Sequence, residues 1–193
     1  MPSNAALRGR VTVMSPGEEL CRACGLCCDG TLFHHVKLVA ADDPRALRAS
    51  GLYVIASRTK TPILRSPQPC AALCADRSCR IYAQRPMQCR TFECRVFQDL
   101  TGGRISKRAA LALVRRARRW ADHARRLLRR FRGDDERLPL SERFLRARRR
   151  AESGEADTSV QETCADLSLV MHRLHLLAHE KFHTRPGAGA PKS

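Results

Sequence analysis

Nine of the ten cysteines gather in two blocks between Cys21 and Cys94. The first block reads CRACGLCC and contains two successive C-x2-C steps. A tight turn across such a step brings both thiolates within bonding reach of one ion. The same C-x2-C-x2-C run can also wrap three corners of an iron–sulfur cluster. The spacing therefore indicates a thiolate-bound metal and leaves zinc and iron as open alternatives.

The first block ends in two adjacent cysteines, Cys27 and Cys28. Neighbouring side chains diverge in both extended and helical backbone, so this pair is not expected to grip one mononuclear ion. If the chain turns helical after Cys24, then Cys24 and Cys28 share a face at positions i and i+4. Cys27 would then be left for a second metal, a bridging role or redox chemistry.

The second block supplies five more cysteines at wider spacings, typical of ligands brought in from loops: Cys70, Cys74, Cys79, Cys89 and Cys94. Together with the first block they suffice for one cluster or for two four-coordinate sites. The alternative is that several are buried as small hydrophobic side chains, as free cysteines often are. Nine cysteines within 74 residues favour metal binding over incidental burial.

The residues around the cysteines add a more specific signal over roughly residues 18–97. The strings are Cys21-x2-Cys24-Gly25-x-Cys27-Cys28, Pro69-Cys70 and Cys79-x-Ile81-Tyr82-x2-Arg85-Pro86-x2-Cys89-Arg90-x-Phe92. Together they resemble the CxxCxxCC family, whose members are described as zinc- or iron-chelating domains. That family includes cysteine-cluster proteins of the YkgJ type, and its cysteine module also occurs in flagellin lysine N-methylases.

The resemblance implies a site of eight cysteines that binds zinc or iron, with a 4Fe-4S cluster as one form of the cofactor. Carried over residue by residue, the metal ligands are Cys21, Cys24, Cys27, Cys28, Cys70, Cys79, Cys89 and Cys94. Cys74 falls in the spacer and is extra, whereas the isolated Cys164 could replace Cys94 as the eighth ligand.

Three other residues of the motif have physical interpretations of their own. Arg85 and Arg90 could offset the negative charge of a thiolate cluster or donate to its sulfurs, and a solvated surface position is the alternative for each. Tyr82 is expected in the core rather than as a catalytic acid.

A site closed entirely by cysteine leaves no open coordination position for Lewis-acid chemistry. The main functional hypothesis is therefore a metal-binding protein with a structural or redox role. The resemblance keeps a component of a protein lysine N-methyltransferase as an alternative, although the chain has no G-x-G-x-x-G cradle for an adenosyl cofactor. Whether the protein is an enzyme stays open.

Charge is concentrated in the middle of the chain. Of a net charge of +17, residues 104–150 contribute 18 Lys and Arg against five Asp and Glu. Such a surface would attract nucleic acid or an acidic protein partner in a salt-dependent way. A solvated arginine-rich helix face is the alternative, because base-stacking aromatic residues are scarce there, with Trp120 and Phe131 expected on the apolar face.

The fold class expected for these 193 residues is α+β, with a small cysteine-rich metal-binding domain followed by a mainly helical, arginine-rich extension. The predicted organisation is a flexible leader at 1–17, the metal-binding domain at 18–100, the helical extension at 101–183 and a disordered tail at 184–193. Low aromatic content, at 5%, suggests a modest core that a metal would supplement.

Within the metal-binding domain, strands are expected at 31–40 and 52–57, around a short helix that Asp42 or Asp43 caps and Gly51 ends. A loop punctuated by Pro62, Pro67 and Pro69 should then deliver Cys70. Apolar periodicity predicts helices at 105–131, 141–151 and 160–183, with Gly133 as a stop and a polar linker at 152–159.

The last predicted helix carries four histidines on one flank, His172, His175, His179 and His183. Imidazoles on one helix face could ligate zinc, and a polar flank is the alternative. The first twenty residues contain no apolar signal segment, and no run of eighteen apolar residues occurs. A cytoplasmic protein without membrane insertion is expected, where clustered cysteines are more often metal ligands than disulfides.

Overall fold

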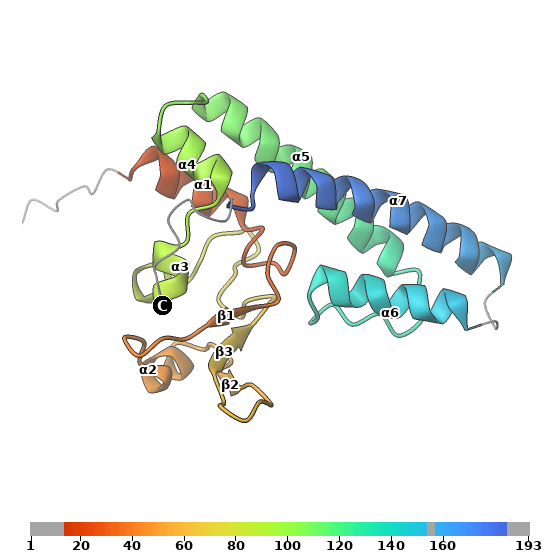
Figure 1. The fold of residues 1–193 in the computed structure, drawn as a ribbon, viewed down its shortest axis with the longest axis horizontal. Helices are drawn as coiled ribbons and strands as arrows, with labels where there is room; N and C mark the ends of the chain where they lie inside the picture. The colour runs from red at the N-terminus through yellow and green to blue at the C-terminus, as the bar shows by residue number, and fades with distance from the viewer. Residues whose placement is uncertain (1–13, 154–156, 185–193) are drawn as a thin grey trace, which may run out of the picture.

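The computed structural model describes residues 14–153 and 157–184. Most of the predicted leader and tail, and part of the 152–159 linker, lie outside the described residues. Helices α1 (Pro16–Cys24), α2 (Pro44–Ala49), α3 (Met87–Thr91) and α4 (Arg95–Thr101) surround a small sheet and the cysteine loops. The long helices α5 (Lys107–Leu128), α6 (Leu140–Glu152) and α7 (Thr158–Lys181) follow, and α5 and α7 run side by side (Figure 1). The predicted α+β class is confirmed.

The sheet contains β1 (His35–Lys37), β2 (Ile55–Ala56) and β3 (Leu64–Pro67), all antiparallel, with β3 in the centre. Val36 pairs with Ser66, and Ile55 pairs with Arg65. The sequence prediction of a loop was wrong for β3, because Leu-Arg-Ser-Pro shows no alternation of apolar residues. Its strand conformation comes from pairing with both neighbours rather than from intrinsic preference.

The helix predictions were largely confirmed. Asp43 caps α2 by accepting from the backbone N–H groups of Arg45 and Ala46, and Gly51 follows with a φ of 87°. The three long helices lie where apolar periodicity placed them, but α5 ends at Leu128, before the predicted stop at Gly133. Residues 129–133 form turns and a bend instead, so the glycine lies within the connection to α6 rather than at the end of the helix.

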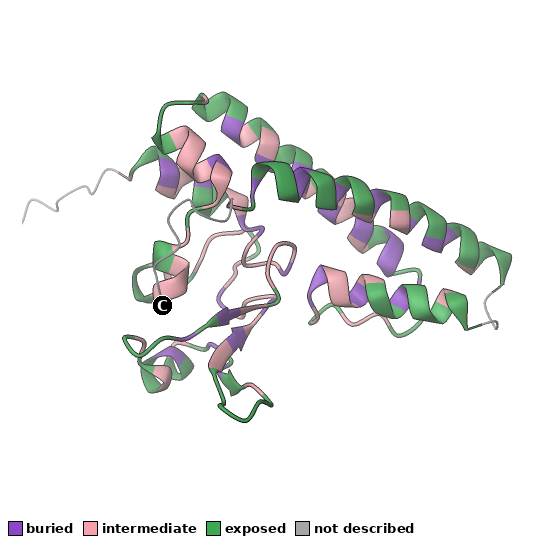
Figure 2. Cartoon of the chain, in the orientation of Figure 1, coloured by how far each residue is buried: buried purple, intermediate pink, exposed green. Residues whose placement is uncertain are grey.

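Two buried clusters hold the structure together. The larger one joins Leu20, Leu26 and Val96 from the cysteine region to the inner faces of α5 and α7 (Figure 2). The smaller one lies between α2, the sheet and the second cysteine block, and contains Leu38, Leu47, Leu52, Val54, Ala72 and Ile81. Since the first cysteine block and the long helices share one core, the position of each depends on the other.

Several arginines of the helical region have structural partners. Arg143 is 3% exposed and donates to both carboxylate oxygens of Asp134, at 2.9 and 2.6 Å. Such a bidentate pair satisfies a charge that would be costly to bury alone. The arginine-rich composition therefore reflects internal pairing as well as solvated surface.

Candidate metal centre

Helix α1 presents the first two cysteines of the motif. Ser15 and Glu18 form a reciprocal capping box, and Pro16 occupies the first turn, so the helix begins two residues before the predicted start of the metal-binding domain. Cys21 and Cys24 are three residues apart on this helix and therefore share a face.

Gly25 ends α1 and sets the direction of the cysteine loop. Its φ is 68°, and a Cβ there would lie 3.3 Å from the Cβ of Arg77. Both observations favour glycine, which adopts left-handed geometry without steric cost. The hypothesis that helix continues after Cys24 and pairs it with Cys28 was wrong, because Gly25 terminates the helix and turns follow at 26–30.

The second block approaches the first through backbone contacts and short helices. The N–H of Cys70 donates to the carbonyl of Cys28 at 2.7 Å. Cys79 lies in a β-bridge with Leu73, Cys89 lies within α3, and Cys94 is the N-cap residue of α4. Segments far apart in sequence thus place their thiols around the loop that follows α1.

The thiols border two adjoining cavities. One is lined by Cys21, Cys27, Cys28, Cys79 and Cys89, and the other by Cys21, Cys24, Cys27, Cys28 and Cys94. The remaining residue of the expected set, Cys70, lies beside Cys28, and its sulfur accepts from the N–H of Ala72 at 3.4 Å. The structure therefore brings the eight cysteines predicted as ligands into one region.

The other two cysteines lie elsewhere. Cys74 is held in a turn by its backbone contacts to Ser78 and Arg77. Cys164 is buried in the helical core, eighteen residues before Phe182, which lines the second cavity. At 1.5 Å per residue this separation is roughly 27 Å along α7. Cys94, rather than Cys164, is the eighth cysteine near the cavities.

Burial controls the protonation of these thiols. It raises the pKa of Cys24 and of Cys89 to about 12. Burial is also the main reason for the raised pKa of Cys28, with Cys70 and Cys89 adding to it, and for the raised pKa of Cys27, with Cys24 and Cys28 adding to it. Without a cation the thiols keep their protons, because closely packed thiolates would repel one another. A bound metal ion would reverse this balance and release protons.

Arg85 brings positive charge to the first cavity. It packs over the Tyr82 ring at 3.6 Å and lies close enough to Cys21 and Cys89 to favour their thiolates, against the larger effect of burial on each pKa. Tyr82 is half-buried and lines the cavity, so it forms a wall rather than part of the core. Arg90 is exposed and donates to the carbonyl of Arg85 at 2.6 Å.

A charge network behind the first loop was not foreseen from the sequence. The Asp29 carboxylate accepts from Arg77 at 2.8 Å and from the N–H of Thr31 at 3.0 Å, and it pairs with Arg125 of α5 at 3.1 Å. Both arginines also pair with Asp122. Helix α5 thus holds the backbone directly after Cys28. No local pattern reveals the two arginine partners, which are at least 48 residues from Asp29.

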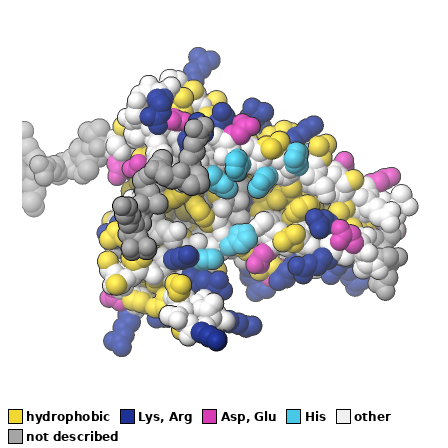
Figure 3. Space-filling view, in the orientation of Figure 1, with side chains coloured by type: hydrophobic (Ala, Val, Ile, Leu, Met, Phe, Trp, Pro, Cys, Tyr) yellow, Lys and Arg dark blue, Asp and Glu magenta, His cyan; other side chains and the backbone are white. Residues whose placement is uncertain are grey.

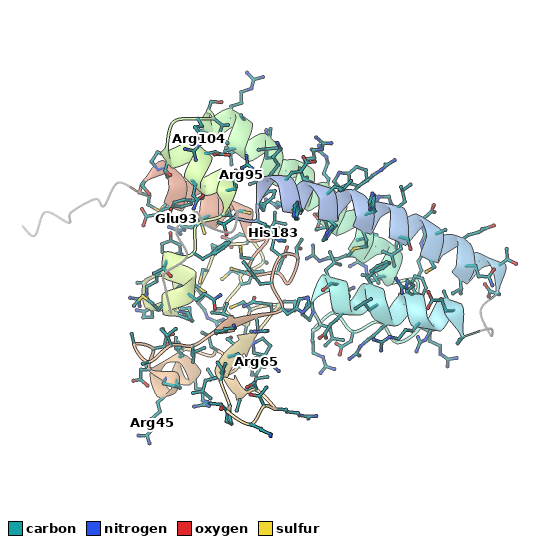
Figure 4. The ribbon with its side chains drawn as sticks, viewed as in Figure 1. Arg45, Arg65, Glu93, Arg95, Arg104 and His183 are labelled. Carbon is teal, nitrogen blue, oxygen red and sulfur yellow. The ribbon has the colours of Figure 1, made fainter. Side chains whose placement is uncertain are left out.

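The end of α7 closes the same region from the other side. The N–H of Arg95 donates to the carbonyl of Phe182 at 3.2 Å, and the Arg95 guanidinium donates to that of Glu180. Figure 4 labels Arg95 and His183 where α4 meets this end of α7. Of the predicted histidines, His183 is therefore the one nearest the cysteine cavities, and His179, His175 and His172 lie progressively farther away along α7.

The donor set fits a thiophilic metal, although the thiols are not arranged around a single ion position. Zinc and iron–sulfur clusters both bind cysteine thiolates, and all ten cysteines are free thiols. Among the described residues, no three Cys, His, Asp or Glu side chains are already placed to hold one ion. Coordination therefore requires the thiols around the cavities to rotate inward.

Comparison with known families gives one match. Residues 20–111 match the model of the CxxCxxCC family, described as a "putative zinc- or iron-chelating domain". No curated protein and no solved structure matches the chain. In the described part of the chain, no helix is both long and apolar enough to cross a membrane.

Proposed function

From the match of residues 20–111 to the CxxCxxCC family, we propose that the protein chelates zinc or iron through eight cysteines arranged as two adjoining four-thiol sets. The observation that carries the proposal is the convergence of seven thiols on two cavities that share one wall, with the eighth, that of Cys70, beside Cys28. Cysteines that were buried only as small hydrophobic side chains would not be expected to gather around shared cavities.

The lining of the two cavities indicates how the thiols divide. Cys79 and Cys89 line only the first cavity, whereas Cys24 and Cys94 line only the second. Cys70 joins the first set through its backbone contact with Cys28, so we assign Cys28, Cys70, Cys79 and Cys89 to one set and Cys21, Cys24, Cys27 and Cys94 to the other. This division assigns the divergent neighbours Cys27 and Cys28 to different centres, in agreement with their geometry.

Four thiolates per centre leave no position for substrate on the metal, so the role is structural or redox rather than Lewis-acid catalysis. A structural role agrees with the core that the cysteine region shares with α5 and α7. A methyltransferase role rests on the resemblance alone and stays a prediction. Cytoplasmic location likewise stays a prediction, supported by the ten free thiols.

Purification under anaerobic conditions, followed by metal analysis and absorption spectroscopy, identifies the metal. A colourless protein with stoichiometric zinc indicates zinc, and a brown protein absorbing near ~400 nm indicates an iron–sulfur cluster. In either case, Cys89→Ala and Cys94→Ala should each lose about half of the bound metal, because they belong to different sets. Protein without either metal would contradict the proposal.

The arginine surface of α5 supports a second proposal, binding to single-stranded nucleic acid. Six exposed arginines on α5 and on the turns after it have no ion pair within the described residues: Arg115, Arg116, Arg119, Arg126, Arg130 and Arg132. Trp120 packs against the helical core, as expected for the apolar face, and its half-buried side chain also lines a groove with Arg116, Arg119 and Arg126. An aromatic ring among cations is typical of surfaces on which bases stack.

Reversing the charge of Arg116, Arg119 and Arg126 to glutamate should abolish retention on single-stranded nucleic acid at ~0.15 M salt. The matched control reverses Arg45, Arg58 and Lys60, which are exposed on the sheet side of the molecule, where Figure 4 shows Arg45 pointing outward. Retention should survive in the control. Equal loss in both variants, or no retention of the wild type, would contradict a specific role for α5.

A further inference from the structure

Histidine side chains form a row along α7, outside the cysteine cavities. His172, His175, His179 and His183 are all exposed, and Figure 3 shows histidines gathered along this helix on the viewed face. The ring centroids of His175 and His179 are 6.4 Å apart, and those of His179 and His183 are 6.3 Å apart. Two overlapping pairs at i and i+4 spacing therefore share His179.

This separation suits a metal ion held between two imidazoles. With metal–nitrogen distances of about 2.1 Å, two rings that bind one ion through their outer nitrogens have centroids about 5 to 6.5 Å apart. The observed separations are at the upper end of that range, and the rings of His175 and His179 are stacked at an interplanar angle of 27°, so these exposed side chains must rotate to direct a nitrogen at a shared ion. Because the described residues contain no group of three side chains set to hold one ion, each site would have two imidazoles and bound water.

Two guanidinium groups near the histidine row contact other partners rather than the imidazoles. Arg173 extends over the Trp120 ring of α5, at 5.2 Å from its centroid. Arg95 is engaged with the carbonyl of Glu180 and with the carboxylate of Asp99. Both guanidinium groups are thus committed to other partners, and the exposed imidazoles keep their free nitrogens for a ligand.

The row ends beside the cysteine region. His183 directly follows Phe182, which lines the cavity bordered by Cys24 and Cys94. We propose that His175, His179 and His183 form two overlapping two-imidazole sites, which share His179 and bind an exchangeable divalent transition-metal ion of the zinc class next to the thiol centre. This site goes beyond the proposed function and stands without it, because its ligands are imidazoles alone.

Zinc titration of the purified full-length protein, followed by calorimetry, tests the site. The wild type should bind zinc beyond the metal it already carries, and His179→Ala should weaken this binding about tenfold or more, since it removes the ligand shared by both pairs. The control is His123→Ala, on α5 beside Trp120, which should bind zinc as the wild type does. Wild-type affinity in His179→Ala would overturn the proposal.

Two further measurements separate this site from the thiol centre. Cys89→Ala should keep the histidine-dependent binding even if its thiol-bound metal is lost, so failure of one site is distinguishable from failure of the other. In the proton NMR spectrum, added zinc should shift the imidazole signals of His175, His179 and His183 and leave that of His34 unchanged. Shifts at His34 as well would indicate general surface binding and overturn the assignment.

Discussion

Cys28→Ala is expected to lose about half of the total bound metal, because less than about a tenth of the wild-type content should remain at the centre formed with Cys70, Cys79 and Cys89. Cys28 borders both cavities, and its carbonyl accepts from the N–H of Cys70. Removing its thiol leaves three ligands and a gap where two cysteine segments meet. Elemental analysis of anaerobically purified protein measures the loss.

Cys74→Ala is the matched control for this substitution. Cys74 lies in the same block, but in a turn whose contacts are made by its backbone. Alanine keeps that backbone, so the variant should bind as much metal as the wild type. If Cys74→Ala and Cys28→Ala lost equal amounts, the ligand assignment would be wrong and general instability of the block would explain the result.

Asp29→Ala is expected to lower the free energy of unfolding of the metal-loaded protein by about 3 kcal/mol. The Asp29 side chain is 10% exposed and pairs with Arg77 and Arg125, which are themselves largely buried. Its removal leaves two guanidinium groups near Cys28 with one fewer carboxylate. Denaturant unfolding measures the change, and Asp29→Asn, which keeps the acceptor for the N–H of Thr31, should lose less.

Glu136→Ala provides the comparison for an exposed ion pair. Glu136 pairs with Arg129 at 3.2 Å, and both side chains are more than half exposed. Such pairs contribute little, so the change should stay within about 0.5 kcal/mol. An Asp29→Ala variant as stable as Glu136→Ala would show that the network does not hold the cysteine loop.

The long helices were predictable because their apolar residues recur at helical spacing over many turns. The short helices were harder. The capping box of Ser15 and Glu18, with Pro16 between them, is a local signal that could have located α1. By contrast, β3 depends on pairing with β1 and β2, and a four-residue strand that contains proline has little propensity of its own.

The candidate site was likewise predictable only in part from the sequence. The spacing of the cysteines located the two blocks, and the family resemblance selected eight of them. The positions of Cys94 and Cys164 could not be distinguished by spacing, because the distance between Cys164 and the cavities depends on the direction of α7. The partners of Asp29 also come from distant segments, so only the folded structure reveals them.

X-ray absorption at the edge of the bound metal tests the central claim most directly, namely that cysteine thiolates alone hold it. For the anaerobically purified protein, the claim predicts a first shell of about four sulfur atoms at ~2.3 Å around each metal atom, with no nitrogen or oxygen. The Cys74→Ala variant should give the same shell. A first shell of nitrogen or oxygen atoms, or the absence of bound metal, would contradict the account.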